Sequence, residues 1–222
     1  MKTLVIDVGG TNVKVLATGQ TEPVKIPSGK GMTPAQMVRQ VREASSAWKY
    51  DNVSIGFPGP VVKGRPAHEP WNLGRGWVRF DFQKAFGKPV RIINDAAMQA
   101  LGSYDGGSML FLGLGTGLGS AMIKDGALLP LELAHLPYKK DYSYEEYLGE
   151  AGMNKRGKRA WRKHVAEVVA LFIAAFVVDY VVLGGGNANR LGRLPPKTRR
   201  GSNANAFAGG YRLWTERWGG TS

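Results

Sequence analysis

The sequence predicts an α/β fold, and three observations support that prediction. Short apolar, β-branched stretches alternate along the chain with stretches of helical spacing. Several of the apolar stretches end at a turn that contains glycine. The chain has 222 residues, 43% of them hydrophobic, which is enough to bury a sizeable core as one large domain or two small ones.

The first half of the chain begins with a predicted hairpin. An apolar strand over residues 3–8 breaks at Gly9 and Gly10, and a second strand over residues 13–17 returns from that turn. The elements predicted after it are a helix over residues 34–48 with Thr33 as N-cap, strands over 53–57 and 90–93, and a helix over 96–101.

From Ser108 the pattern starts again. Strands over residues 109–114 and 118–123 flank a glycine turn and weakly echo the first hairpin, which predicts a second domain built on a related plan. A helix over 158–176, a strand over 179–183 and a final helix over 204–218 complete the prediction. We divide the chain into an N-terminal α/β lobe (residues 1–107), a C-terminal α/β lobe (108–203) and a C-terminal helix (204–222).

The composition excludes several classes of protein. The absence of cysteine removes disulfides, thiolate zinc sites and cysteine nucleophiles. The longest apolar run, residues 168–178, falls short of the roughly 20 residues that a membrane span needs. The first strand is too short and too soon interrupted by Asp7 to be a secretory signal. We therefore expect a soluble cytoplasmic protein with no membrane partner.

The charge is strongly positive. The 30 lysines and arginines against 17 aspartates and glutamates give a net charge of +13 and a pI near 10.0, which favours polyanionic partners. Basic residues gather at 155–163 and at 190–200. Each cluster is a candidate anion-binding surface, and the alternative for each is a solvated helix face or loop.

Three glycine turns are candidate phosphate-binding sites. Glycine lets backbone N–H groups approach a phosphate closely, and a threonine hydroxyl adds a donor, although hairpins also need glycine for the turn itself. None of the turns matches the P-loop or the dinucleotide-binding pattern. The candidate residues are Gly9, Gly10, Thr11, Asn12 and Lys14 at the first turn, Gly115, Thr116 and Gly117 at the second, and Gly184, Gly185 and Gly186 at the third.

Two aspartates at strand ends are candidates for chemistry. Asp7 lies beside the first turn and could hold Mg²⁺ through water, or simply cap the turn. Asp95 ends a strand and opens a helix with Asn94 before it, so it could be a helix N-cap, a general base, or both.

Two further pairs of residues suit a polar ligand. Glu132 and His135 share a face if their segment is helical, and hydrogen bonding to a polyhydroxylated ligand is favoured over metal binding. Trp71 and Asn72 could supply an aromatic wall and an amide for a sugar, or the tryptophan could pack on the core.

Taken in order, these pieces resemble the ROK (repressor, open reading frame, kinase) sugar kinases, particularly the polyphosphate glucokinase branch. The matching stretches cover nearly the whole chain: Asp7-Val-Gly-Gly-Thr, Gly56-Phe-Pro-Gly-Pro, Trp71-Asn72-Leu, Asn94-Asp95-Ala, Leu114-Gly-Thr-Gly-Leu-Gly-Ser-Ala, Glu132-Leu-Ala-His, Tyr144-Glu-Glu-Tyr-Leu-Gly, Tyr180-Val-Val-Leu-Gly-Gly-Gly-Asn, Asn203-Ala-Asn-Ala-Phe and Gly209-Gly-Tyr-Arg-Leu-Trp.

The resemblance implies an actin-like ATPase (ribonuclease H-like) fold, with two α/β lobes around a cleft and the last helix returning to the first lobe. It implies a glucose 6-kinase with Asp95 as base and Mg²⁺, near Asp7, at the phosphates of polyphosphate or ATP. A homodimer is what the family suggests. The residues implied to bind the sugar are Pro58, Gly59, Asn72, Asn94, Glu132, His135 and Glu145.

Two departures from the family pattern matter. Ala134 stands where the family has glycine, and the cysteine-rich zinc motif of many members is absent, so we expect no zinc and no metal ligation by His135. No helix-turn-helix precedes Asp7, which argues against the repressor half of the family.

The sequence is compatible with more than one phosphoryl donor and more than one sugar substrate. An ATP-only glucokinase and a kinase of mannose or an N-acetylhexosamine are the enzymatic alternatives. A sugar-sensing or nucleic-acid-binding protein is the alternative from another class, although binding alone needs no base, and we expect no nucleic-acid partner.

Overall fold

The computed structural model describes residues 1–216 and 218, and its framework is two five-stranded sheets with the same strand order. The first sheet runs β3-β2-β1-β4-β7 and the second β10-β9-β8-β13-β14. In each sheet, three antiparallel strands are followed by two parallel ones. The second half of the chain thus repeats the plan of the first. The division into lobes at residue 107 stays a prediction.

The first sheet and its helices are formed by β1 (Thr3–Val8), β2 (Asn12–Ala17), β3 (Val24–Pro27), α1 (Pro34–Ala44), β4 (Asn52–Phe57), α2 (Phe82–Phe86), β7 (Val90–Asn94) and α3 (Asp95–Ser103), with a small hairpin of β5 (Val61–Val62) and β6 (Arg65–Pro66). The second sheet and its helices are formed by β8 (Met109–Leu114), β9 (Leu118–Lys124), β10 (Ala127–Leu131), the 3-10 turn η1 (Leu133–His135), β11 (Pro137–Lys139), β12 (Tyr142–Ser143), α4 (Tyr144–Leu148), α5 (Glu150–Phe176), β13 (Tyr180–Gly184), η2 (Ala188–Arg190), β14 (Thr198–Arg200) and α6 (Asn205–Thr215).

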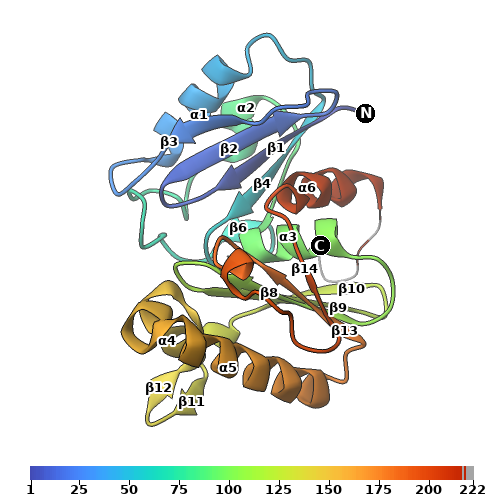
Figure 1. Ribbon diagram of the computed structural model, residues 1–222. Helices are drawn as coiled ribbons and strands as arrows, with labels where there is room; N and C mark the ends of the chain where they lie inside the picture. Colours follow the sequence, from blue (N-terminus) through green and yellow to red (C-terminus); the bar gives the residue numbers. More distant parts are fainter. Residues whose placement is uncertain (217, 219–222) are drawn as a thin grey trace.

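The elements stack in layers (Figure 1). Helices α1 and α2 cover the outer face of the first sheet, α3 and α6 lie between the sheets, and α4 and α5 cover the outer face of the second sheet. Strand β1 is largely apolar because it is buried on both faces. Leu4, Ile6 and Val8 pack into the outer core while Val5 packs into the middle one, since alternate side chains leave a strand on opposite faces.

Helices α3 and α6 pack closely because small residues face each other. A side-chain carbon on Gly102 would overlap the carbonyl oxygen of Asn205, and one on Gly209 would overlap the carbonyl oxygen of Met98. Helix α6 also reaches the first sheet, where Ser54 Oγ donates a 2.6 Å hydrogen bond to the Gly210 carbonyl. The C-terminal helix is therefore in contact with strand β4 of the first sheet.

Most predicted strands are found within a residue or two of their expected bounds, but three helices differ. The first ends at Ala44 rather than at residue 48, because the Ser45 hydroxyl bonds back to the Val41 carbonyl and its backbone leaves the helical region. The long helix begins at Glu150 rather than at 158 and is interrupted at Gly157.

The last helix spans Asn205–Thr215, shorter at both ends than the predicted 204–218. Residues 217 and 219–222 of the proposed C-terminal segment lie outside the described residues. Among the residues that the structure describes, no helix combines the length and apolar character needed to cross a membrane.

Candidate active site

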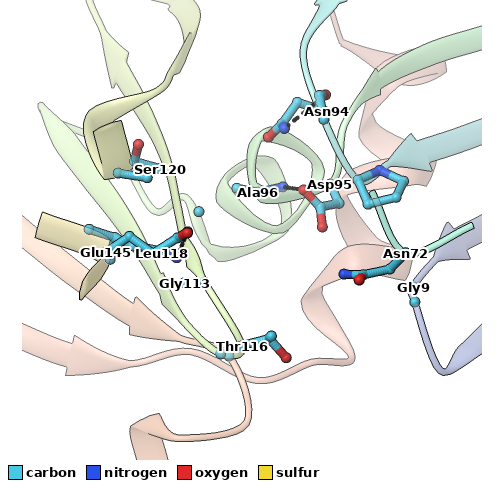
Figure 2. A pocket seen from close by; sticks show the side chains of 18 of the residues that line it. Gly9, Asn72, Asn94, Asp95, Ala96, Gly113, Thr116, Leu118, Ser120 and Glu145 are labelled. Carbon is cyan, nitrogen blue, oxygen red and sulfur yellow. Dashed lines mark hydrogen bonds between the residues drawn. The ribbon is translucent and has the colours of Figure 1, made fainter. Parts of the chain in front are cut away.

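A cavity of about 640 Å³ lies where the two sheets present their strand ends to each other (Figure 2). Strands β1, β4 and β7 are parallel, so their carboxyl ends meet at one edge, as do those of β8 and β13. The predicted site residues that line this cavity are Gly9, Gly10, Thr11, Pro58, Gly59, Asn72, Asn94, Asp95, Gly115, Thr116, Gly117, Glu132, His135, Glu145 and Gly185.

Asp95 is the first residue of α3, and its carboxylate points into the cavity (Figure 2). The expectation that Asp95 caps this helix is wrong. The N-cap is Asn94, whose Oδ1 accepts from the Ala97 N–H at 3.1 Å, while Asp95 Oδ1 accepts from the Ala96 N–H at 2.8 Å. Because Asn94 does the capping, the second carboxylate oxygen of Asp95 is left to face the cavity.

The environment of Asp95 favours its protonated form. Burial is the main cause, the nearby carboxylates of Asp7 and Glu132 add to it, and together they raise the pKa of Asp95 to about 7 although the Ala96 N–H opposes them. An aspartate with a pKa near neutrality, at a strand end in a cavity, is a candidate general base.

One side of the cavity is fixed by a side-chain hydrogen bond and by close packing. Asn94 Nδ2 donates to the Gly59 carbonyl at 3.1 Å, which ties the 58–59 turn to the start of α3. Asn72 packs so tightly on Gly10 that a side-chain carbon there would lie 2.8 Å from Asn72 Cβ. Trp71 is 96% exposed, so the alternative that it packs on the core is excluded.

The second glycine turn joins the C-terminal side of the cavity to α4 and α5. Glu145 Oε2 accepts from the Leu118 N–H at 3.1 Å, and any side-chain carbon on Gly117 would overlap that carboxylate. The Glu150 N–H donates to the Gly115 carbonyl at 3.0 Å, which attaches the start of α5 to the same turn. Glu145 thus lies against the turn that is predicted to face phosphate.

Glu132 and His135 lie at the rim of the cavity. Their segment is the 3-10 turn η1 rather than an α-helix, yet the two side chains meet as expected, with 3.7 Å between His135 Nε2 and Glu132 Oε2. Burial raises the pKa of Glu132, an effect that His135 opposes. Both side chains are accessible to a ligand, being 48% and 75% exposed.

Asp7 and Lys14 form an ion pair beneath the first turn, with 3.1 Å between Lys14 Nζ and Asp7 Oδ2. The two carboxylates of Asp7 and Asp95 repel each other, and a hard cation that keeps most of its water is the kind of group that suits them. No group of three or more His, Asp or Glu side chains gathers as a metal site within the described part of the chain. The pair of carboxylates is compatible with a hydrated Mg²⁺, and both the Mg²⁺ site at Asp7 and the absence of zinc stay predictions.

Not every predicted residue reaches the cavity wall. Those absent from its lining are Asp7, Asn12, Lys14, Gly184 and Gly186. Conversely, Lys30, Gln99 and Ser120 line the cavity and were not predicted. For Lys30 a signal existed in the stretch Ser28-Gly-Lys-Gly, a glycine-flanked cation. Gln99 follows Asp95 by one helical turn, and its Oε1 is buried without a partner in the described structure.

The sequence of this chain is similar to the sequences of known sugar kinases. A sequence profile of the ROK family matches residues 3–130. The polyphosphate glucokinase of Mycobacterium leprae (strain TN) is 26% identical over 214 residues, covering 86% of this chain and 65% of that protein. The chain therefore spans just under two thirds of that relative's length. The glucokinase of Pyrobaculum calidifontis is 26% identical over 250 residues, covering 88% and 84%.

Among solved structures, the inorganic polyphosphate/ATP-glucomannokinase from Arthrobacter sp. strain KM superposes with a TM-score of 0.71 at 24% identity, covering 94% of this chain and 96% of that one. At that identity the likeness establishes the fold. The expected actin-like ATPase fold, with two α/β lobes around a cleft, is thereby confirmed.

Proposed function

This chain belongs to the ROK family, and from that premise we propose that it is a sugar kinase which transfers a phosphoryl group from polyphosphate, ATP or both to the 6-hydroxyl of glucose. One observation carries the proposal: Asp95, with its pKa raised to about 7, faces a cavity that is bordered by two glycine turns. The names of the relatives, polyphosphate glucokinase and glucokinase, support glucose as the acceptor.

The reaction requires one proton to leave the sugar. The Asp95 carboxylate accepts the proton of the 6-hydroxyl while that oxygen forms a bond to the terminal phosphorus of the donor. The bond between this phosphorus and its bridging oxygen breaks, and the electron pair leaves with the shortened donor. With a pKa of about 7, Asp95 is ionised in about half of the molecules at neutral pH and is still basic enough to hold the proton.

The two glycine turns would hold the donor phosphates. Thr11 and Thr116 line the cavity from opposite lobes, so their hydroxyls and the backbone N–H groups of the two turns are the candidate donors, and Lys30 adds a cation. Asp7 would hold Mg²⁺ through water, and that ion when bound would neutralise phosphate charge. The Asp7–Lys14 ion pair keeps the Asp7 carboxylate oriented beneath the first turn.

The sugar would lie between Asp95 and the rim. Asn72 and Asn94 flank the base on one side, and Glu132 and His135 approach from the other lobe. Amide and carboxylate groups from both lobes can bind several hydroxyls at once, so closure of the lobes would orient the 6-hydroxyl and exclude water. We place this reaction in the cytoplasm and, from the family, in a homodimer.

Replacement of Asp95 by asparagine tests the assignment. Asp95→Asn keeps the shape and the bond from the Ala96 N–H but cannot accept the proton, so kcat should fall about 10²- to 10⁴-fold. Glucose binding, measured by calorimetry, should stay within about threefold of wild type. A matched control is Asp125→Asn, in the turn between β9 and β10, which should leave kcat unchanged. A variant at Asp95 that keeps more than a tenth of the wild-type kcat would exclude this role.

A further inference from the structure

Two basic stretches that lie far apart in the sequence meet on the outer side of the second lobe. Arg162 of α5 donates to the Arg190 carbonyl through Nε at 2.8 Å and Nη2 at 2.5 Å. Arg200 donates to the Gly192 carbonyl at 3.2 Å. Arg162 and Arg193 line the same hollow of about 380 Å³. We call Arg159, Arg162, Arg190, Arg193 and Arg200 the basic surface.

The charges of the basic surface are not neutralised by the protein. No aspartate or glutamate occurs between Glu150 and Glu167 in α5, or between Asp179 and Glu216. Within the described residues, none of the five arginines forms an ion pair, and all five are exposed. Like charges held this close repel each other, and a bound polyanion would relieve that repulsion.

Other members of the two predicted clusters have structural partners instead. Arg156 stacks over the Tyr147 ring at 3.6 Å and donates to the Glu146 carbonyl. Arg199 pairs with Asp105 at 3.1 Å and lies over Tyr180. Arg156 and Arg199 are therefore engaged with side chains of the protein. The guanidinium groups of Arg162 and Arg200, by contrast, bond to backbone carbonyls, and their charge is not paired with a carboxylate in the described structure.

The two segments that carry the basic surface are both attached to the second glycine turn, which lines the active-site cavity. Asn187 is fixed to the second glycine turn, since its Nδ2 donates to the Gly115 carbonyl at 3.1 Å. The 3-10 turn η2 carries the chain from there to Arg190, an advance of roughly 6 Å at about 2 Å per residue. The start of α5 is fixed to the same turn through the Glu150 N–H. Helix α5 then runs along the outer face of the second sheet (Figure 1).

We propose that the basic surface binds the distal, non-reacting phosphates of a polyphosphate chain whose end lies in the active-site cavity. This inference rests on the proposed kinase function. Arginine suits the task, because its planar guanidinium makes paired hydrogen bonds to phosphate oxygens. A nucleoside triphosphate has too few phosphates to occupy both the cavity and the basic surface. The surface thus favours long polyphosphate over short donors through affinity, with no change in the chemical step.

The double variant Arg159→Gln/Arg193→Gln tests the proposal, since it removes two charges and leaves the hydrogen bonds of Arg162 in place. The KM for long-chain polyphosphate (tens of phosphates) should rise on the order of tenfold, at two- to fivefold for each exposed contact. The KM for tripolyphosphate, ATP and glucose should stay within twofold. Added salt should raise the KM for long polyphosphate more steeply in wild type than in the variant.

The matched control is Arg39→Gln/Lys49→Gln, which removes the same charge from exposed positions in the first lobe. An equal rise in KM in this control would assign the effect to net charge and overturn the proposal. An equal loss for tripolyphosphate or ATP, or duplex DNA bound as tightly as long polyphosphate at the same ionic strength, would overturn it too.

Direct binding of long polyphosphate, followed by calorimetry without glucose, separates this inference from the proposed function. Binding that depends on Arg159 and Arg193 without polyphosphate-driven turnover would keep the site and reject polyphosphate as the donor. Turnover with polyphosphate that the double variant leaves unchanged would keep the donor and reject the site.

Discussion

The raised pKa of Asp95 has a consequence for stability that can be calculated. Its ordinary value is 3.8 and its value in the folded protein is about 7. Between those pH values the native protein holds a proton that the unfolded chain has lost, so the free energy of unfolding falls as the pH rises. At 1.36 kcal/mol per pKa unit, the raised pKa of Asp95 lowers the free energy of unfolding by about 2 kcal/mol at pH 5 and about 4 kcal/mol at pH 8, relative to a carboxyl whose pKa is 3.8 in both states.

Asp95→Asn removes this penalty, because asparagine is neutral at every pH and its Oδ1 can accept the same bond from the Ala96 N–H. Urea denaturation at pH 5 and pH 8 should therefore find the variant more stable than wild type, by about 2 kcal/mol more at pH 8 than at pH 5. The exposed-turn control Asp125→Asn should show no such dependence on pH. A variant at Asp95 whose stability relative to wild type is the same at both pH values would refute the assigned environment.

Two further predictions concern rate and packing. With saturating donor, kcat/KM for glucose should rise about tenfold per pH unit up to about pH 7 and then level off, because Asp95 must be ionised to accept the proton. A flat profile between pH 5 and 8 would contradict this. Gly102→Ala should lower the free energy of unfolding in urea by about 1–3 kcal/mol, because the added carbon overlaps the Asn205 carbonyl oxygen. Gly31→Ala, where the added carbon meets nothing within 4 Å, is its control, and equal effects in the two variants would contradict the packing argument.

The parts of the fold that could be predicted depend on local signals. The apolar run before Gly9 and the one before Gly115 are each long enough to identify a buried strand, and glycine identifies the turn after it. Strands β3 and β14 were missed because they are short, lie at sheet edges and carry charged residues, so their pairing is decided by tertiary contact.

The same difference between local sequence signals and tertiary contacts applies to the residues of the candidate site. Asp95 was found because a strand end followed by a helix start is visible in the sequence. The raised pKa of Asp95 could not be predicted, since it depends first on burial in the folded protein and then on the charge of Asp7, which comes from another strand. Gln99 and Lys30 were missed because their approach to the cavity is set by the packing of α3 and by the path of the loop after β3.

A coupled assay for glucose 6-phosphate, run with Mg²⁺ and either polyphosphate or ATP as sole donor, tests the central claim most directly. We predict turnover with polyphosphate that is lost in Asp95→Asn. Turnover with ATP alone would keep the glucose kinase and reject the polyphosphate donor. No glucose 6-phosphate from either donor, with a folded protein that binds glucose, would contradict the account.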